Sequence, residues 1–398
     1  MMVIFALISI ISALFIGVSL YLLLLTGAAF LFQKKTDAKA APLSLLVIIP
    51  AHNEALLIRD TIEAVARSRY PANCYGIVVI ADNCQDDTAA VAEQAGAQAL
   101  VRSDLIRRGK GQALDWFLKE RQDIYASYEG ITIIDADTLV DENFLQEVSA
   151  SLSHPEVQVV QGYYGVLNAA EGWRTALMSA ALAVFHHVRP AGRNGLGGSA
   201  GLKGNGMGFQ ASVLKNYGWP AHSVVEDLEF GAQMLLDGIC VHYNPDAIIL
   251  AEMATTRKQA ETQRQRWEGG RYEIFRKYAP ALLRKYLSQW RFCYFDGFMD
   301  LLIPPLSALV LTLVVLVTAS LWLFPFMTLP LGFALAGIVF YVVSGLVLRK
   351  APLAIWLYLF AAPFFILWKI PLYLKIVIGG TNGEWVRTKR KAEMQKKD

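Results

Sequence analysis

The feature that constrains this chain most is a long apolar run at its N-terminal end. Residues 3–32 contain no charged side chain. A helix of about 20 apolar residues crosses the hydrocarbon core of a bilayer, and this run is longer. A cleavable signal peptide is the competing interpretation, but no basic segment precedes the run, and Lys34, Lys35 and Lys39 follow it. We therefore predict a transmembrane helix within residues 1–33, with the N-terminus outside and the following region inside.

A second apolar region lies near the C-terminal end, and the two regions hold the excess that raises the hydrophobic content of the whole chain to 55%. Two uncharged stretches predict a transmembrane hairpin over residues 305–350. The next stretch, 352–378, is interrupted by Pro363 and Pro371 and contains two lysines. If it crossed the membrane, the basic tail would lie outside, against the positive-inside rule. Interfacial or re-entrant helices are therefore predicted for residues 351–398, followed by a basic tail that lies inside.

Residues 261–304 form a different kind of hydrophobic segment. Arg and Lys alternate there with Trp, Tyr, Phe and Leu. This mixture is typical of amphipathic helices that lie in the headgroup region, although a surface helix of a soluble domain has a similar composition. The position of the segment, directly before the predicted hairpin, favours interfacial helices.

The middle of the chain, residues 42–260, alternates between strand and helix patterns. The stretch 45–49 is apolar throughout and is followed by Pro50, as in a strand buried on both faces. Asn53 is the predicted N-cap of a helix over 54–68. The other predicted strands are 76–82, 97–103, 131–137 and 157–165, with helices over 86–96, 110–121 and 141–152 between them. This alternation predicts an α/β fold, with a mostly parallel sheet and helices on both faces.

Composition excludes several classes of function. A net charge of +3, without a basic helix interleaved with aromatic residues in the middle region, argues against a nucleic-acid partner. Four cysteines without a C-x-x-C pair predict reduced, structural thiols, which suits a domain that faces the cytosol. No glycine-rich dinucleotide motif or Walker motif follows any predicted strand.

Two acidic positions follow predicted strands. Asp135 and Asp137 close the strand over 131–137, and alternate residues of an extended segment point the same way. Two carboxylates at a strand end suit Mg²⁺ or Mn²⁺ that a diphosphate completes, although Asp also favours turns. Asp82 follows the second strand, where it either contacts a ligand or caps the next helix.

Two further motifs carry residue types suited to group transfer. Glu226 and Asp227 open a predicted helix, where a carboxylate would stay ionised and could act as a general base, or simply cap the helix. Gln263, Arg266 and Trp267 share one helical face. Arginine suits a diphosphate and indole suits a sugar ring, whereas anchoring to lipid headgroups is the alternative.

The glycine-rich segment 197–209 is interpreted as a loop that lines an acceptor path, with an ordinary surface loop as the alternative.

These motifs occur in the order IPAHNE, ADN, Asp-Ala-Asp, Glu-Asp and Gln-x-x-Arg-Trp, ahead of membrane helices. This order resembles glycosyltransferase family 2, in particular its membrane-integrated cellulose synthase and hyaluronan synthase type, over roughly residues 44–390. The resemblance implies a GT-A-like catalytic domain, a nucleotide-sugar donor with UDP as the family expectation, and Mg²⁺ or Mn²⁺. Val224 and Val225 stand where the family often has a Thr, and about three spans are fewer than large polymer synthases have.

The resemblance also implies a role for each matching residue. The residues that would contact the nucleotide sugar are Asp82, Glu54, Lys110 and Asp135. Those that would hold the metal are Asp135 and Asp137. Asp227 would be the general base, and Glu226 would tune it. Gln263, Arg266 and Trp267 would position the diphosphate and the acceptor, and Trp385, Thr388 and Lys389 resemble a gating loop.

The predicted function is an inverting transfer of a sugar to a growing exported or cell-surface glycan. Two alternatives remain: transfer of one sugar to a polyprenyl-linked or ceramide-like lipid, and a non-catalytic membrane partner that binds nucleotide sugars. The predicted location is a bacterial inner (plasma) membrane, with the catalytic domain in the cytosol. Membrane lipids are expected contacts, and a homo-oligomer or an export partner is compatible with this function.

Overall fold

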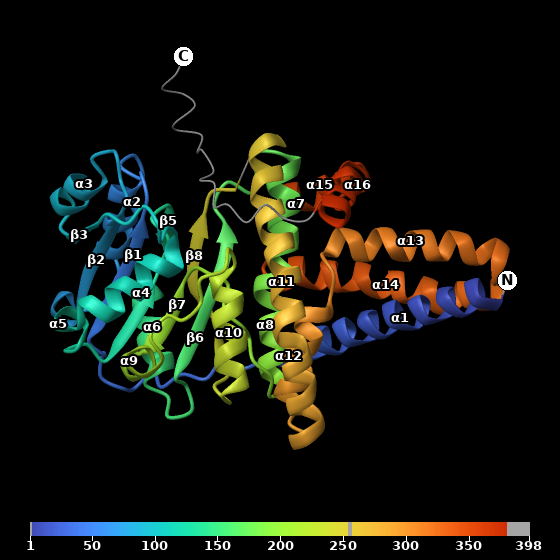
Figure 1. Ribbon diagram of the computed structural model, residues 1–398, viewed down its shortest axis with the longest axis horizontal. Helices are drawn as coiled ribbons and strands as arrows, with labels where there is room; N and C mark the ends of the chain where they lie inside the picture. The colour runs from blue at the N-terminus through green and yellow to red at the C-terminus, as the bar shows by residue number, and fades with distance from the viewer. Residues whose placement is uncertain (1, 254–256, 380–398) are drawn as a thin grey trace, which may run out of the picture.

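The computed structural model describes residues 2–253 and 257–379, and it separates a sheet domain from a bundle of long helices (Figure 1). The sheet has eight strands in the order β3-β2-β1-β4-β7-β6-β8-β5. The strands are β1 (Leu45–Ala51), β2 (Tyr75–Asp82), β3 (Gln98–Arg102), β4 (Gly130–Ile133), β5 (Thr138–Val140), β6 (Val159–Val166), β7 (Met207–Gln210) and β8 (Val241–Ala251).

Parallel pairing predominates in the sheet, as predicted. Strand β1 pairs in parallel with β2 and β4, β2 with β3, and β6 with β8. The pairs β4–β7, β6–β7 and β5–β8 are antiparallel. The α/β class is confirmed, and the antiparallel pairs come from the short strands β5 and β7, neither of which the sequence pattern predicted as a separate strand.

Both faces of the sheet are buried, and the residues of β1 show why. Leu45, Val47 and Ile49 belong to the core on one face, whereas Leu46 and Ile48 belong to the core on the other. Alternate residues of a strand point to opposite faces, so an uninterrupted apolar strand serves two helix layers.

The first face is covered by α2 (Ile58–Ala66), α3 (Thr88–Gln94) and α6 (Phe144–Leu152). The second is covered by α4 (Lys110–Glu120), α5 (Gln122–Tyr125), α9 (Ala211–Tyr217) and α10 (Glu226–Leu236). Three short elements complete this part of the chain: η1 (Ala72–Cys74), η2 (Val184–Val188) and α8 (Arg189–Gly195).

The prediction that Asn53 caps a helix over 54–68 is wrong. Helix α2 begins at Ile58, with Leu57 at the N-cap position. Asn53 instead has a φ of 56°, and its side-chain oxygen accepts a hydrogen bond from the backbone N–H of Gln85 at 2.7 Å. Asparagine tolerates this left-handed conformation, so it turns the chain directly after β1 instead of starting a helix.

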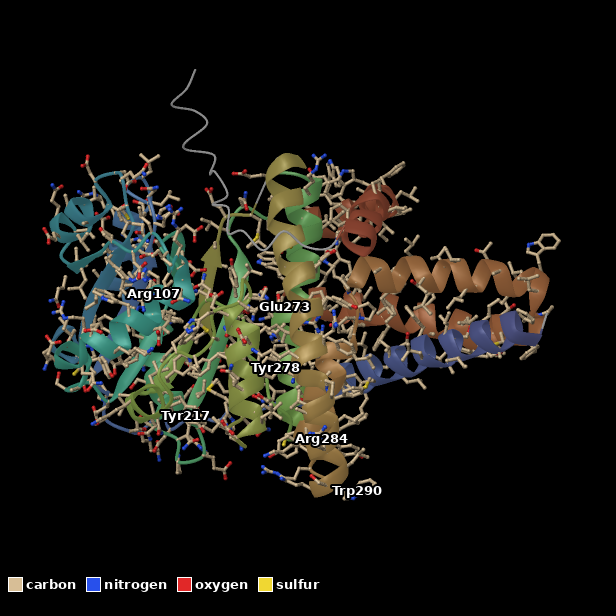
Figure 2. All side chains as sticks on the ribbon, viewed as in Figure 1. Arg107, Tyr217, Glu273, Tyr278, Arg284 and Trp290 are labelled. Atoms are coloured by element: carbon tan, nitrogen blue, oxygen red, sulfur yellow. The ribbon has the colours of Figure 1, made fainter. Side chains whose placement is uncertain are left out.

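Three long apolar helices lie side by side and extend away from the sheet: α1 (Met2–Phe30), α13 (Leu306–Leu323) and α14 (Pro325–Leu348) (Figure 1). The sticks on this bundle in Figure 2 are almost all carbon, whereas nitrogen and oxygen crowd the sheet domain. Only Phe324 separates α13 from α14, so the hairpin turn is very short.

The bundle and the sheet domain share one continuous hydrophobic core. Leu22 and Leu25 of α1 belong to the same cluster as Val188 and Ala191 near α8. A Cβ added to Gly192 would lie 2.2 Å from a backbone oxygen of α1, so the two helices cross in direct contact. Beyond α1, Lys34 forms ion pairs with Glu147 (2.6 Å) and Asp246 (2.7 Å) of the sheet domain.

Helices α11 (Arg257–Gln289) and α12 (Phe292–Leu302) cross between the sheet and the bundle (Figure 1). Helix α11 thus begins four residues before the segment 261–304, whose interfacial placement stays a prediction. Figure 2 places Tyr278 between α10 and α11, where its hydroxyl donates to Glu229 at 3.0 Å. One face of α11 therefore packs on protein, through Ile274, Tyr278 and Leu282, while Tyr272 remains exposed.

The remaining helices, α7 (Trp173–Ala183), α15 (Leu353–Tyr358), η3 (Leu359–Ala361) and α16 (Ala362–Gly379), lie where the bundle meets α11. In the described part of the chain, four helical stretches are long and apolar enough to cross a membrane: Ile8–Phe30, Leu306–Leu323, Pro325–Leu348 and Leu353–Pro371. All four are candidates by length and composition alone. The interfacial or re-entrant placement of the fourth stretch stays a prediction.

Candidate active site

One cavity of about 1610 Å³ connects the sheet to the membrane-side helices. Its floor lies beyond the carboxyl ends of β1, β2 and β4, where ligands of parallel sheets bind. All eight predicted site residues whose side chains are described line this cavity. They are Glu54, Asp82, Lys110, Asp135, Asp137, Glu226, Asp227 and Trp267.

The two carboxylates of the Asp-Ala-Asp motif lie beyond β4, because the strand ends at Ile133. The motif forms the bend before β5 instead of extending the strand. Asp135 and Asp137 are nevertheless both half-buried on the cavity wall, and Ala136 between them is buried in the core. The motif therefore places both carboxylates in the lining of one cavity, from a turn and not from the extended strand that the sequence predicted.

Lys110, the first residue of α4, links the two halves of the site. Its Nζ lies 2.6 Å from Oδ1 of Asp135, and it also donates to the carbonyl oxygen of Gly204. Burial alone would lower the pKa of Lys110, but attraction to Asp135, Glu226 and Asp227 raises it overall. The ammonium is therefore a permanent cation beside both acidic motifs.

The donor set around Asp135 and Asp137 fits a divalent cation held in an open site. Carboxylate oxygens are hard ligands, and Mg²⁺ is often held by one or two carboxylates plus substrate phosphates. In the part of the chain that the structure describes, no three His, Cys, Asp or Glu side chains converge on one point. Such a site would need the diphosphate of the donor to complete it.

Asp82 is buried at the end of β2 and is held by neighbours from within the domain. Arg102 Nη1 donates to its Oδ1 at 2.5 Å, and Asn83 Nδ2 donates to the same oxygen at 3.0 Å. Asn83 has a φ of 53°, so the chain turns sharply here, as it does at Asn53 after β1. Asp82 is thus a fixed acceptor on the cavity wall, not a cap of α3.

Glu226 and Asp227 open α10 and face the cavity. Burial raises the pKa of Glu226 to about 7, with Lys110 acting against this effect and Asp227 adding to it. Burial also raises the pKa of Asp227, whereas backbone N–H groups at the helix start, Lys110 and Lys203 lower it. Ionisation of the Asp227 carboxylate near pH 7 therefore depends on Lys110 and Lys203 as well as on the N-terminus of the helix.

The glycine-rich segment holds the acidic groups in place. Gly204 has a φ of 79°, and a Cβ there would lie 3.2 Å from Oδ2 of Asp227. Asn205 is fully buried; its Oδ1 accepts from the Asp135 N–H at 3.1 Å, and its Nδ2 donates to Thr138 at 2.7 Å. The segment therefore joins the Asp-Ala-Asp bend to the start of α10.

The Gln-x-x-Arg-Trp motif lies on α11. Trp267 lines the cavity and packs on the cluster that contains Val166, Leu182 and Met253. The side chains of Gln263 and Arg266 lie outside the described ones, as do residues Trp385, Thr388 and Lys389 of the gating-loop-like segment. Their roles stay predictions.

A family model described as glycosyltransferase like family 2 matches residues 42–270, more than half of the chain. The chain belongs to this family. The matched range contains both acidic motifs and extends through Gln-x-x-Arg-Trp to the first turns of α11.

Curated relatives of this family-2 chain act on different acceptors by name. Glucomannan 4-beta-mannosyltransferase 7 of Arabidopsis thaliana is 24% identical over 369 residues, covering 87% of this chain and 64% of that protein. Beta-monoglucosyldiacylglycerol synthase of Trichormus variabilis is 27% identical over 265 residues, covering 64% of this chain and 54% of that protein. The chain thus spans between about half and two-thirds of the length of these relatives.

Among solved structures, a mannosyltransferase from Pyrobaculum calidifontis in complex with GDP-Man and Mn²⁺ matches with a TM-score of 0.48 and 18% identity. The match covers 89% of this chain and 99% of that one.

Sequence reasoning missed four residues that lie outside the predicted catalytic motifs but contribute to the site. Arg102, Asn205, Lys203 and Arg271 all contact or line the cavity region, yet none belongs to a motif. The segment around Asn205 was singled out only for its glycines. The sequence offered one indication of these residues: Arg102 lies in a predicted strand, and an Arg buried there needs an acidic partner.

Proposed function

We propose that this chain is an inverting glycosyltransferase that takes a sugar from a nucleotide-sugar donor, with UDP as the expected nucleotide, at the cytosolic face of a bacterial plasma membrane. One observation supports it above all: a single cavity holds the carboxylates of Asp135 and Asp137, a fixed lysine and a second acidic pair at a helix start. Its continuation toward α13, α14 and α16 supplies an acceptor path from the membrane side.

In the proposed reaction, Asp227 takes the proton from a hydroxyl group of the acceptor. The freed oxygen attacks the anomeric carbon of the donor from the face opposite the diphosphate. The bond between this carbon and the phosphate oxygen breaks, and its electron pair leaves with the nucleoside diphosphate. One displacement of this kind inverts the anomeric centre.

The chain's own residues prepare this displacement. Lys110 places a cation between Asp135 and the acidic pair, where it favours the negative charge that develops on the leaving diphosphate. Glu226, with a pKa of about 7, exchanges protons near neutral pH and sets the field around Asp227. Mg²⁺ or Mn²⁺ bound by Asp135 and Asp137 would supply additional charge neutralisation for the diphosphate.

The test is direct transfer by the full-length chain. Purified protein in detergent is incubated with a panel of radiolabelled nucleotide sugars and Mg²⁺ or Mn²⁺, in the presence of a lipid extract from the source membrane. Labelled polymer and labelled lipid are then separated. Transfer from one donor, lost in the Asp227→Asn variant, supports the proposal. Absence of transfer from every donor by a folded protein contradicts it.

A further inference from the structure

A cluster of buried charges lies between the catalytic cavity and the membrane bundle. Arg193 on α8 pairs with Asp296 (2.9 Å) and Asp300 (3.0 Å) on α12, and Arg189 pairs with Asp300. The hydroxyl of Tyr21, on α1, donates to Asp296 at 2.6 Å. These contacts join the apolar bundle to the catalytic domain through charged groups, all of them buried.

Two more cations, Lys203 and Arg271, adjoin this cluster and line the cavity. Arg271 donates to the backbone oxygen of Asp300, and among the described residues neither Lys203 nor Arg271 forms an ion pair with a carboxylate. The cluster thus holds four cations and two carboxylates. Two of the cations, Lys203 and Arg271, line the cavity, where Lys203 also acts on Asp227. A poorly solvated cation without a carboxylate at ion-pair distance favours binding of an anion.

The electrostatics of Lys203 agree with this geometry. Burial lowers its pKa to about 8; Asp300 raises it, and the cations of Arg193, Arg189 and Arg271 lower it further. Burial likewise lowers the pKa of Arg271 to about 10. An anion placed between the two side chains would relieve both effects.

Helices α14 and α16 contribute a mostly apolar part of the cavity wall, with Ile338, Val339, Val342, Val343, Phe365 and Ile366 in its lining. The charged group of α16 in this lining, Lys369, is paired with Glu268 at 2.6 Å. Val339 is 57% exposed, so this part of the wall is open to the surroundings of the bundle. A hydrocarbon chain needs only such an apolar wall, whereas a sugar polymer also needs hydrogen-bond partners for its hydroxyl groups.

We propose that the acceptor is a phosphate-bearing lipid: Lys203 and Arg271 hold its phosphate, and its hydrocarbon chain lies along the apolar wall of the cavity. This inference rests on the proposed function, because it names the acceptor of the same transfer. The base Asp227 lies beside Gly204, Lys203 is next to Gly204 in the chain, and Lys203 and Arg271 both interact with Asp300. The groups of the acceptor would follow this order, with the hydrocarbon chain on the apolar wall.

This order matches one lipid architecture. The hydroxyl that loses its proton to Asp227 belongs to the headgroup, the phosphate follows it, and the hydrocarbon chain follows the phosphate. The new bond joins the headgroup oxygen to the anomeric carbon of the sugar, and the nucleoside diphosphate leaves. The lipid phosphate stays intact. Glycerophospholipids with a free headgroup hydroxyl and sugar-bearing isoprenoid phosphates both have this architecture.

Binding of simple probes tests the inference without a donor. The full-length chain in neutral detergent is titrated, by native mass spectrometry, with farnesyl phosphate, farnesol, dioctanoylphosphatidylglycerol and inorganic phosphate. We expect a phosphate-bearing lipid to bind about 10-fold or more tightly than farnesol, since hydrogen bonds to charged groups contribute on this scale. The tighter of the two phosphate lipids identifies an isoprenoid or a glycerolipid source. Equal binding of farnesol and both phosphate lipids overturns the inference.

Two pairs of matched variants, Lys203→Gln with Lys215→Gln and Val339→Trp with Val347→Trp, locate the ligand, and Lys203→Arg tests rescue. Lys203→Gln should weaken binding of the phosphate lipid about 10-fold, Lys203→Arg should restore it, and the exposed Lys215→Gln on α9 should change nothing. Val339→Trp fills the apolar wall, whereas Val347→Trp, also on α14 and 51% exposed, lies outside the cavity lining. Only the first should weaken binding. Thermal unfolding of each variant confirms that it is folded, and equal affinities within either pair contradict the assignment.

The outcomes separate this inference from the proposed function. Sugar transfer without phosphate-dependent lipid binding would support the proposed glycosyltransferase activity and contradict the proposal of a phosphate-bearing lipid acceptor. Lipid binding without transfer from any nucleotide sugar removes the catalytic proposal, and the acceptor role with it.

Discussion

Replacing Asp227 by Asn separates a general base from a helix-capping residue. Asn has nearly the shape of Asp and stabilises a helix N-terminus about as well, so the start of α10 should remain intact. The lost carboxylate contributes roughly 0.3–1 kcal/mol through the helix dipole, which bounds the expected loss of stability. Lys110 and Asp135 keep their 2.6 Å contact, so affinity for the donor should be preserved.

The effect on turnover should be far larger than the effect on folding. An amide cannot accept the acceptor's proton, and a lost general base costs about 10²–10⁴-fold in rate. A hundredfold loss corresponds to about 2.7 kcal/mol of transition-state stabilisation. The substitution also removes the negative charge that raises the pKa of Glu226, which should therefore fall below about 7. Any residual activity that depends on Glu226 should extend to lower pH.

The assay combines single-turnover transfer of radiolabelled sugar with calorimetric titration of the donor nucleotide. Asp237→Asn is the matched control, since it makes the same change at the exposed C-terminal end of the same helix. We expect kcat to fall in Asp227→Asn alone, with the donor Kd unchanged in both variants. Turnover within about twofold of wild type in Asp227→Asn would refute the assignment, and Glu226 would be the next candidate for the base.

Three further predictions concern the metal, the lysine and the membrane. Excess EDTA should abolish transfer, and Asp137→Asn should do the same without changing thermal unfolding; full activity in EDTA would exclude the metal role. Lys110→Met removes a cation that lowers the pKa of Glu226 and that of the base Asp227, so both pKa values should rise. Because the base acts deprotonated, the acidic limb of the pH–rate profile should move to higher pH, and an unmoved limb would contradict the assignment. In a chain without its native cysteines, a cysteine near Lys39 should resist an impermeant thiol reagent added outside cells, and one at Met327 should react; the reverse pattern would invert the topology.

The sequence predicted the parts of the fold that depend on local patterns. The apolar run at 45–49 became a strand buried on both faces, and Lys110 begins a helix as expected. Strand β7 was missed because its four residues lie in a glycine-rich segment without alternation, and they pair with β4 and β6 from distant parts of the chain. Asn53 was misassigned because its side chain serves caps and left-handed turns equally well.

The sequence alone determined the order and chemical type of the motifs: apolar runs that can cross a membrane, and acidic pairs at Asp135–Asp137 and Glu226–Asp227. The spacing of residues within a motif is local, so the motifs can be recognised in the sequence without knowledge of the fold. Only the tertiary structure brought Lys110 to Asp135 and joined both acidic pairs in one cavity. Only the tertiary structure placed Lys203 and Arg271 beside the buried charges of α8 and α12. Contacts between segments that are distant in the chain cannot be read from the spacing of residues. The same holds for the burial that shifts the pKa values of these two side chains.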